Sequence, residues 1–141
     1  MTMTVTRTPL DEAIEQSRFV LAGTLGGDAD AHLELLSERE DVTLANPFGL
    51  ARGRAAVSEG LLRARNYFSD VEVVGVQPVA KYVGDDLACV VEVELYRAKV
   101  DEDDDYNVFG VRVTNVFRFE DGRFRLVHRH TDLVPDPPLH H

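Results

Sequence analysis

The sequence has one cysteine and few basic residues for its length. Cys89 is the only cysteine among 141 residues, so the chain can form neither an intrachain disulfide nor a cysteine metal cluster. Lysine and arginine number 15 against 25 aspartates and glutamates, which gives a formal net charge of −10. Such an acidic chain is poorly suited to bind nucleic-acid phosphates or anionic membrane surfaces. We therefore predict neither a nucleic acid nor a membrane as a partner.

Long apolar stretches are missing as well. No apolar run approaches the roughly 20 residues that a membrane-spanning helix needs. The opening stretch, MTMTVTRTPLDEA, has no apolar core of the kind found in signal peptides. These two absences lead us to expect a cytoplasmic protein. His140 and His141 close the chain, either as native residues or as the remnant of a purification tag, and they enter no argument about a site.

What the sequence does contain is typical of one soluble α+β domain. Hydrophobic residues make up 44% and charged residues 28% of the chain. We expect tails over residues 1–7 and 135–141 and a single domain over 8–134. A proline cannot sit in a central strand, so the first strand should end at Asn46-Pro47 and the chain should turn there. Helices are predicted over about 8–22, 28–38 and 54–68, and strands over 41–48, 70–83, 88–100, 108–120 and 123–134.

The order of these elements predicts a sheet that is covered by helices on one face. Strands joined by hairpins form an antiparallel sheet, and the three N-terminal helices must cover one side of it. Gly75 and Pro78 indicate a bend or bulge within a long strand. A sheet that curls in this way and is closed by helices would enclose a cavity. Asp121-Gly122 is the strongest hairpin signal in the chain.

The hairpin turn predicts which side chains share a face. With Asp121-Gly122 as a two-residue turn, Asn115 should face His128, and Val113 should face His130, on the same side as Phe117 and Leu126. This register sends both histidines into the cavity. The opposite, outer face would hold several arginines, namely Arg112, Arg118, Arg125 and Arg129.

Three interpretations of His128 and His130 are open at this point. They can be buried histidines with satisfied nitrogens, groups that bind a ligand or transfer a proton, or two ligands of a metal. A metal site needs at least a third ligand, and the sequence does not supply one nearby. The acidic stretch DEDDD (101–105) lacks the glycine and the distal glutamate of a calcium-binding EF-hand, so we interpret it as a solvated loop. We predict no metal and no cofactor, and His128 is the candidate acid or base.

Other residues are candidates for ligand binding, namely His130, Asn115, Asn46, Arg97 and Tyr96. Each has a structural alternative: Asn46 can be a turn residue before Pro47, Tyr96 a rim aromatic, and Arg97 a cation at the sheet edge. Glu92 and Glu94 alternate with valines and are expected to face away from the cavity. His32 is expected at a solvated helix position.

Three stretches resemble the SnoaL-like group of the nuclear transport factor 2-like superfamily: GGDADAHLELLSEREDVTLANPFG, ARGRAAVSEGLLRA and VRVTNVFRFEDGRFRLVHRHTD. The resemblance covers about residues 10 to 133. It implies a cone-shaped α+β domain with a pocket between a curved sheet and the helices. It also implies a homodimer that forms through the outer face of the sheet.

The resemblance leaves two hypotheses for function, because the superfamily contains isomerases, cyclases, dehydratases, epoxide hydrolases and transport factors. The first is a small-molecule pocket protein, such as an isomerase, lyase, cyclase or hydrolase acting on an apolar or polyketide-like ligand. The second is a non-catalytic dimerising or ligand-sensing module with a residual pocket. Relatives of ketosteroid isomerase use a pocket aspartate as the base, whereas the carboxylate that the sequence offers here is Asp132, which follows the two histidines on the same predicted face and could reach the mouth of the pocket.

Overall fold

The computed structural model describes residues 8–25, 29–100 and 105–134 of the chain. The predicted tails and residues 101–104 of the acidic loop lie outside the described residues. No helix within these ranges is long and apolar enough to cross a membrane. The described elements are α1 (Pro9–Leu25), α2 (Ala29–Leu35), β1 (Thr43–Asn46), β2 (Gly49–Arg52), α3 (Arg54–Tyr67), β3 (Phe68–Val83), β4 (Leu87–Val100), β5 (Tyr106–Glu120) and β6 (Arg123–Val134).

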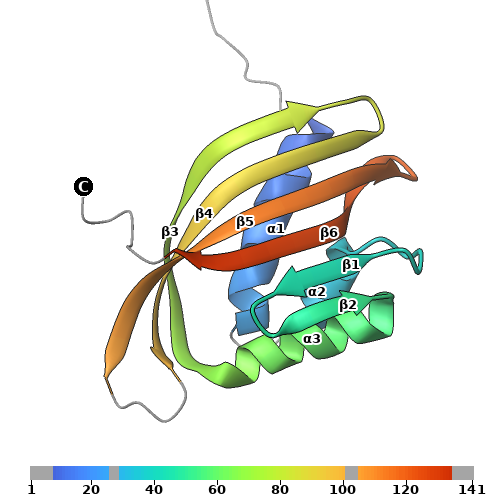
Figure 1. The fold of residues 1–141 in the computed structure, drawn as a ribbon. Helices are drawn as coiled ribbons and strands as arrows, with labels where there is room; N and C mark the ends of the chain where they lie inside the picture. The colour runs from blue at the N-terminus through green and yellow to red at the C-terminus, as the bar shows by residue number, and fades with distance from the viewer. Residues whose placement is uncertain (1–7, 26–28, 101–104, 135–141) are drawn as a thin grey trace, which may run out of the picture.

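The strands form one sheet in the order β2-β1-β6-β5-β4-β3 (Figure 1). Neighbouring strands are antiparallel, apart from β1 and β6, which run parallel. The prediction of an α+β domain with a mostly antiparallel sheet is therefore confirmed. The sequence did not predict β2, which follows the turn at Pro47 and pairs back on β1 from Gly49 to Arg52.

Local interactions explain where α1 and α3 begin. The Thr8 hydroxyl accepts a hydrogen bond from the Asp11 amide at 3.1 Å, and the Asp11 carboxylate accepts one from the Thr8 amide at 3.2 Å, which is a reciprocal cap. Before α3, Gly53 has a φ of 92°, and its amide donates to the Val42 carbonyl at 2.8 Å. This bond ties the start of α3 to the segment that enters β1.

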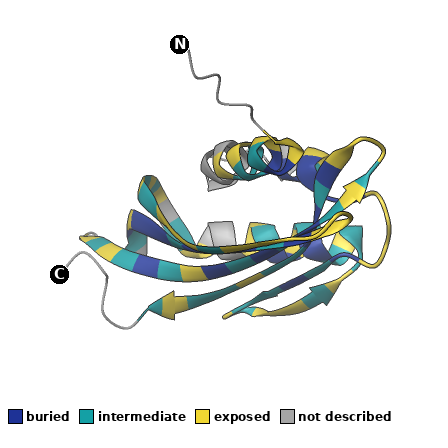
Figure 2. Cartoon of the chain, turned by 90° about the horizontal axis from the view of Figure 1, so that it is seen from above, coloured by how far each residue is buried: buried dark blue, intermediate teal, exposed yellow. Residues whose placement is uncertain are grey.

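The hydrophobic core lies between the helices and one face of the sheet, which is the inner face. In Figure 1, α1 crosses behind the sheet and α3 runs along the edge that β2 forms. Buried and more exposed positions alternate along the strands in Figure 2, as expected when one face packs against helices. The core residues are Leu10, Ala13, Leu35, Leu36, Val42, Leu44, Val57, Ala88, Val90, Phe117, Phe124 and Leu126.

The ladder between β5 and β6 follows the prediction only close to the turn. Asp121 and Gly122 both have a positive φ, 52° and 86°, as a two-residue hairpin turn requires. Phe119 pairs with Phe124, and Phe117 pairs with Leu126, as predicted. The next pair joins Val116 to His128, so Val127 is an extra residue on β6, which is a β-bulge.

The bulge changes the face of every later side chain on β6. Asn115 pairs with Arg129, and Val113 pairs with Thr131. The predicted pairing of Asn115 with His128 is therefore wrong. Arg129 now lies on the inner face with Asn115, and the two histidines lie on the outer face.

Candidate functional site

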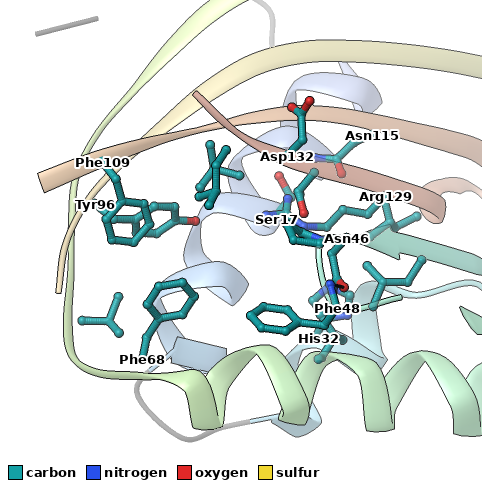
Figure 3. Close-up of a pocket in the computed structure, with 18 of the residues that line it drawn as sticks. Ser17, His32, Asn46, Phe48, Phe68, Tyr96, Phe109, Asn115, Arg129 and Asp132 are labelled. Carbon is teal, nitrogen blue, oxygen red and sulfur yellow. Dashed lines mark hydrogen bonds between the residues drawn. The ribbon is translucent and has the colours of Figure 1, made fainter. Parts of the chain in front are cut away.

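A cavity of about 130 Å³ lies between the inner face of the sheet and the three helices (Figure 3). Most of its wall is apolar or aromatic, and a few polar side chains interrupt that wall. The lining residues are Ser17, His32, Leu35, Leu44, Asn46, Pro47, Phe48, Leu61, Phe68, Val71, Tyr96, Phe109, Val111, Asn115, Leu126, Arg129, Thr131, Asp132 and Leu133.

A buried ion pair lies at one side of this cavity. The Arg129 guanidinium donates two hydrogen bonds to the Glu94 carboxylate, at 2.7 and 3.1 Å, and the Tyr96 hydroxyl donates a third at 2.5 Å. Both charged side chains are largely buried, with 13% of Arg129 and 2% of Glu94 exposed. Burial and the adjacent Glu94 charge both raise the pKa of Tyr96, so its hydroxyl stays protonated and remains a donor.

A second ion pair lies beside the first on β4. Glu92 accepts a hydrogen bond from Arg18 of α1 at 3.1 Å, and its side chain is 2% exposed. The expectation that Glu92 and Glu94 face away from the helices is therefore wrong. The alternation along β4 predicts that Val91 and Val93 face the helices, whereas Glu92 and Glu94 are the residues that do so. Burial of each carboxylate is compensated by an arginine from another element, which the sequence of β4 alone does not reveal.

His32 is buried in the cavity wall, so the expectation of a solvated position is wrong. The residue is 5% exposed, and its Nδ1 has no hydrogen-bond partner. Burial, and secondarily the positive charge of Arg129, lowers the pKa of His32 from 6.5 to about 4. The imidazole is therefore neutral near pH 7. The short α2 helix places it there because Leu35 and Leu36 hold this segment in the core.

Asn115 is the second polar side chain in the wall with an unsatisfied atom. It is 2% exposed and shares the buried face of β5 with Val113 and Phe117. Its Oδ1 has no hydrogen-bond partner. A buried carbonyl oxygen without a partner costs about 1–3 kcal/mol. Asn115 was predicted as a ligand-binding residue, and the structure places it in the cavity wall.

The structure places His128 and His130 outside the cavity. The Nδ1 of His128 lies 2.7 Å from the Thr43 hydroxyl of β1, and the two imidazole rings are 6.3 Å apart. Burial, followed by repulsion from His130, lowers the pKa of His128. His130 is exposed. The prediction that these histidines point into the cavity is wrong, because the bulge at Val127 turns them outward.

The remaining candidates are divided between the cavity and the surface. Tyr96 and Asn46 line the cavity, and the Asn46 Oδ1 accepts a hydrogen bond from the Phe48 amide at 2.9 Å. Arg97 is 45% exposed and pairs with Glu72 at 3.7 Å, away from the cavity lining. The structure thus brings Tyr96, Asn46 and Asn115 together around one space and leaves Arg97 outside it.

Charged side chains around the cavity are paired with groups of opposite charge. Arg129, 13% exposed, is paired with Glu94, and Arg18, 41% exposed, is paired with Glu92, so each of the two buried carboxylates has one arginine partner. The Asp132 carboxylate bonds Arg112, and both side chains are about half exposed. Within the described ranges, no three His, Cys, Asp or Glu side chains gather as metal ligands. The cavity therefore offers a neutral wall with hydrogen-bonding groups.

Comparison with known proteins identifies the fold and then the family. The fold matches an NTF2-like superfamily protein from Salmonella enterica with a TM-score of 0.71 and 17% identity, over 89% of this chain and 88% of that one. A ketosteroid isomerase-like protein from Erwinia carotovora atroseptica matches with a TM-score of 0.73 and 13% identity, over 88% and 95%. An NTF2-like protein with a cystatin-like fold from Novosphingobium aromaticivorans matches with a TM-score of 0.65 and 23% identity, over 92% and 87%.

These likenesses establish an NTF2-like fold. The chain belongs to the SnoaL-like domain family, whose model matches residues 21–136. The resemblance expected from the sequence is therefore confirmed. A search of curated proteins found no match.

Proposed function

We propose that this protein binds a small, largely apolar molecule in the cavity beneath the helices. The observation that supports this most is the composition of the cavity wall, which is apolar and aromatic with a few inward polar groups. Ligand sites commonly combine these two properties, because apolar surface supplies affinity and isolated polar groups fix orientation. His32 and Asn115 supply such groups.

The polar groups are difficult to explain as parts of an ordinary core. A core position that leaves a nitrogen or an oxygen unsatisfied lowers stability by about 1–3 kcal/mol, and an apolar side chain of similar shape would avoid that cost. The chain retains His32 and Asn115 in the wall of one cavity. A bound molecule that hydrogen-bonds these atoms would compensate the cost.

Toluene binding, measured by two-dimensional amide NMR, tests this proposal. We expect saturable shift changes at cavity residues of the wild-type protein. Val111→Phe should abolish them by filling the cavity, whereas Val74→Phe, on an exposed position of β3, should leave them unchanged. Thermal unfolding would verify that both variants fold. If toluene gives no saturable change in the wild-type protein, the proposal is wrong.

Acid–base catalysis on the bound molecule is a second candidate function. It is favoured by His32, whose neutral imidazole has an Nδ1 without a partner and lines the cavity. A neutral imidazole can accept a proton from a ligand and return it elsewhere, as an isomerase, lyase or hydrolase requires. By contrast, His128 lies on the outer face and cannot serve this role. If His32→Gln preserves both binding and any turnover found, a purely binding or ligand-sensing role is favoured.

The size of the cavity constrains the ligand in either case. A cavity of about 150 Å³ holds one benzene molecule, and the cavity here is about 130 Å³. A polycyclic, polyketide-like compound would therefore extend beyond this space. We propose a ligand whose enclosed part is no larger than one ring.

A further inference from the structure

We propose that the ligand is an uncharged, single-ring compound that carries a hydroxyl group, with phenol as the simplest member of the class. The inference rests on the proposed binding function and specifies the ligand of that same cavity. Charge balance, the two unsatisfied polar atoms and the aromatic wall each restrict the choice independently.

Charge balance excludes an ionised ligand. The Glu94 carboxylate is engaged by Arg129 and Tyr96, and Glu92 is engaged by Arg18. No buried charge among these side chains is left over to neutralise a carboxylate or an ammonium group. Transfer of an unpaired charge into such a wall costs several kcal/mol at least, on the order of the penalty for any uncompensated buried ion. A neutral ligand avoids this penalty.

The two unsatisfied atoms favour a ligand group that can act as a donor or as an acceptor. A neutral imidazole nitrogen can donate or accept according to the tautomer, and the Asn115 amide can present either its oxygen or its nitrogen by rotation. The structure leaves His32 Nδ1 and Asn115 Oδ1 without partners. A hydroxyl can donate to an accepting atom and can accept from a donating one. It therefore satisfies His32 in either tautomer and Asn115 in either orientation of its amide, whereas a ketone only accepts.

The aromatic wall favours a ring. Phe68 stacks on Phe109 with ring centroids 5.2 Å apart, and Tyr96 stacks on the same Phe109 at 5.6 Å. All three side chains line the cavity, and Figure 3 shows their rings along one side of it. Aromatic pairs in stacked or edge-to-face contact gain about 0.5–1.5 kcal/mol beyond burial alone. A flat ligand can extend this stack, and the cavity volume limits it to one ring.

Calorimetric titration with four probes of similar size tests the inference: phenol, toluene, benzoate and benzylamine. We expect wild-type protein to bind phenol at least as tightly as toluene and to bind each charged probe at least about tenfold more weakly than phenol. Asn115→Leu should weaken phenol about tenfold and leave toluene unchanged or tighter. His32→Leu should also lower the preference for phenol over toluene.

Control variants and outcomes separate the inference from the function on which it rests. His128→Ala, on the outer face, should change neither affinity. If toluene binds but phenol binds more weakly, or if benzoate or benzylamine binds as tightly as phenol, the ligand class is wrong and the binding function stands. If Asn115→Leu and His32→Leu both fold and leave the phenol preference intact, the ligand class is again wrong. If no probe binds, the proposed function fails together with the inference.

Discussion

Asn115 lies directly across the β5–β6 ladder from Arg129, because Val127 bulges out of β6 three residues after Phe124. This single pairing decides which charged groups face the helices. It brings Arg129 within hydrogen-bond distance of Glu94 on β4, and it turns His128 toward Thr43 on the outer face. The candidate site depends on this bulge, as is common where β-bulges redirect side chains near functional sites.

Removal of the charge on Glu94 should destabilise the fold strongly. Glu94→Gln leaves the Arg129 guanidinium buried without a counter-charge, which typically costs about 3–5 kcal/mol. Glu72→Gln is the matched control, because Glu72 pairs with Arg97 on the surface with both side chains about half exposed or more. Such a surface pair contributes about 0–1 kcal/mol. Urea denaturation would measure both, and equal losses would contradict the buried ion pair.

His32 should make stability depend on pH in mildly acidic solution. Its pKa falls from an ordinary value of 6.5 to about 4 in the folded protein. Between these values the unfolded state binds the proton and the folded state does not, so stability is complete above pH 6.5 and declines as pH falls toward 4. The full loss is on the order of 3 kcal/mol. His32→Gln should show a smaller decline than wild type across this window.

An NMR titration of the imidazole C–H signals provides the direct check. The His32 signal should shift near pH 4, and it should be the signal that is absent from His32→Gln. The same slope of stability in the wild-type protein and in His32→Gln would show that another group is responsible.

His128→Ala should have a small effect on stability and none on the cavity. The side chain contacts Thr43 at 2.7 Å on the outer face, so its removal costs about 0.5–1.5 kcal/mol for one hydrogen bond. Toluene binding followed by NMR should be unchanged. A loss of binding without unfolding would contradict the outward direction of this side chain.

We also predict a homodimer that forms through the outer face of the sheet. The helices cover the inner face, and the outer face carries Thr114 between Val91 and His130. Thr114→Glu would place a charge in the middle of that face and should convert a dimer into a monomer in light scattering. Ala55→Glu, at an exposed position in the first turn of α3, is the control and should remain dimeric. A wild-type protein that is monomeric at micromolar concentration would contradict the prediction.

Residue patterns along the chain predicted the described helices, the strands other than β2, a mostly antiparallel sheet and the family. Local signals were sufficient for these: the capping pair Thr8 and Asp11, the break at Pro47, and the turn at Asp121-Gly122 with its two positive φ angles. Two of the three register shifts in β3 lie beside Gly75 and Pro78, where residue type predicted a bend. Each of these features follows from the conformational limits of a few neighbouring residues.

Contacts between elements that lie far apart in the chain set which polar side chains face the cavity. The bulge at Val127 contains neither glycine nor proline, so its local sequence resembles a regular strand. Arg129 can be buried because Glu94, 35 residues away in the chain, compensates its charge. His32 is likewise carried inward by the packing of Leu35 and Leu36 rather than by its own polarity. Compensation between distant charges and the packing of neighbouring side chains are properties of the assembled core, so no local pattern specifies them.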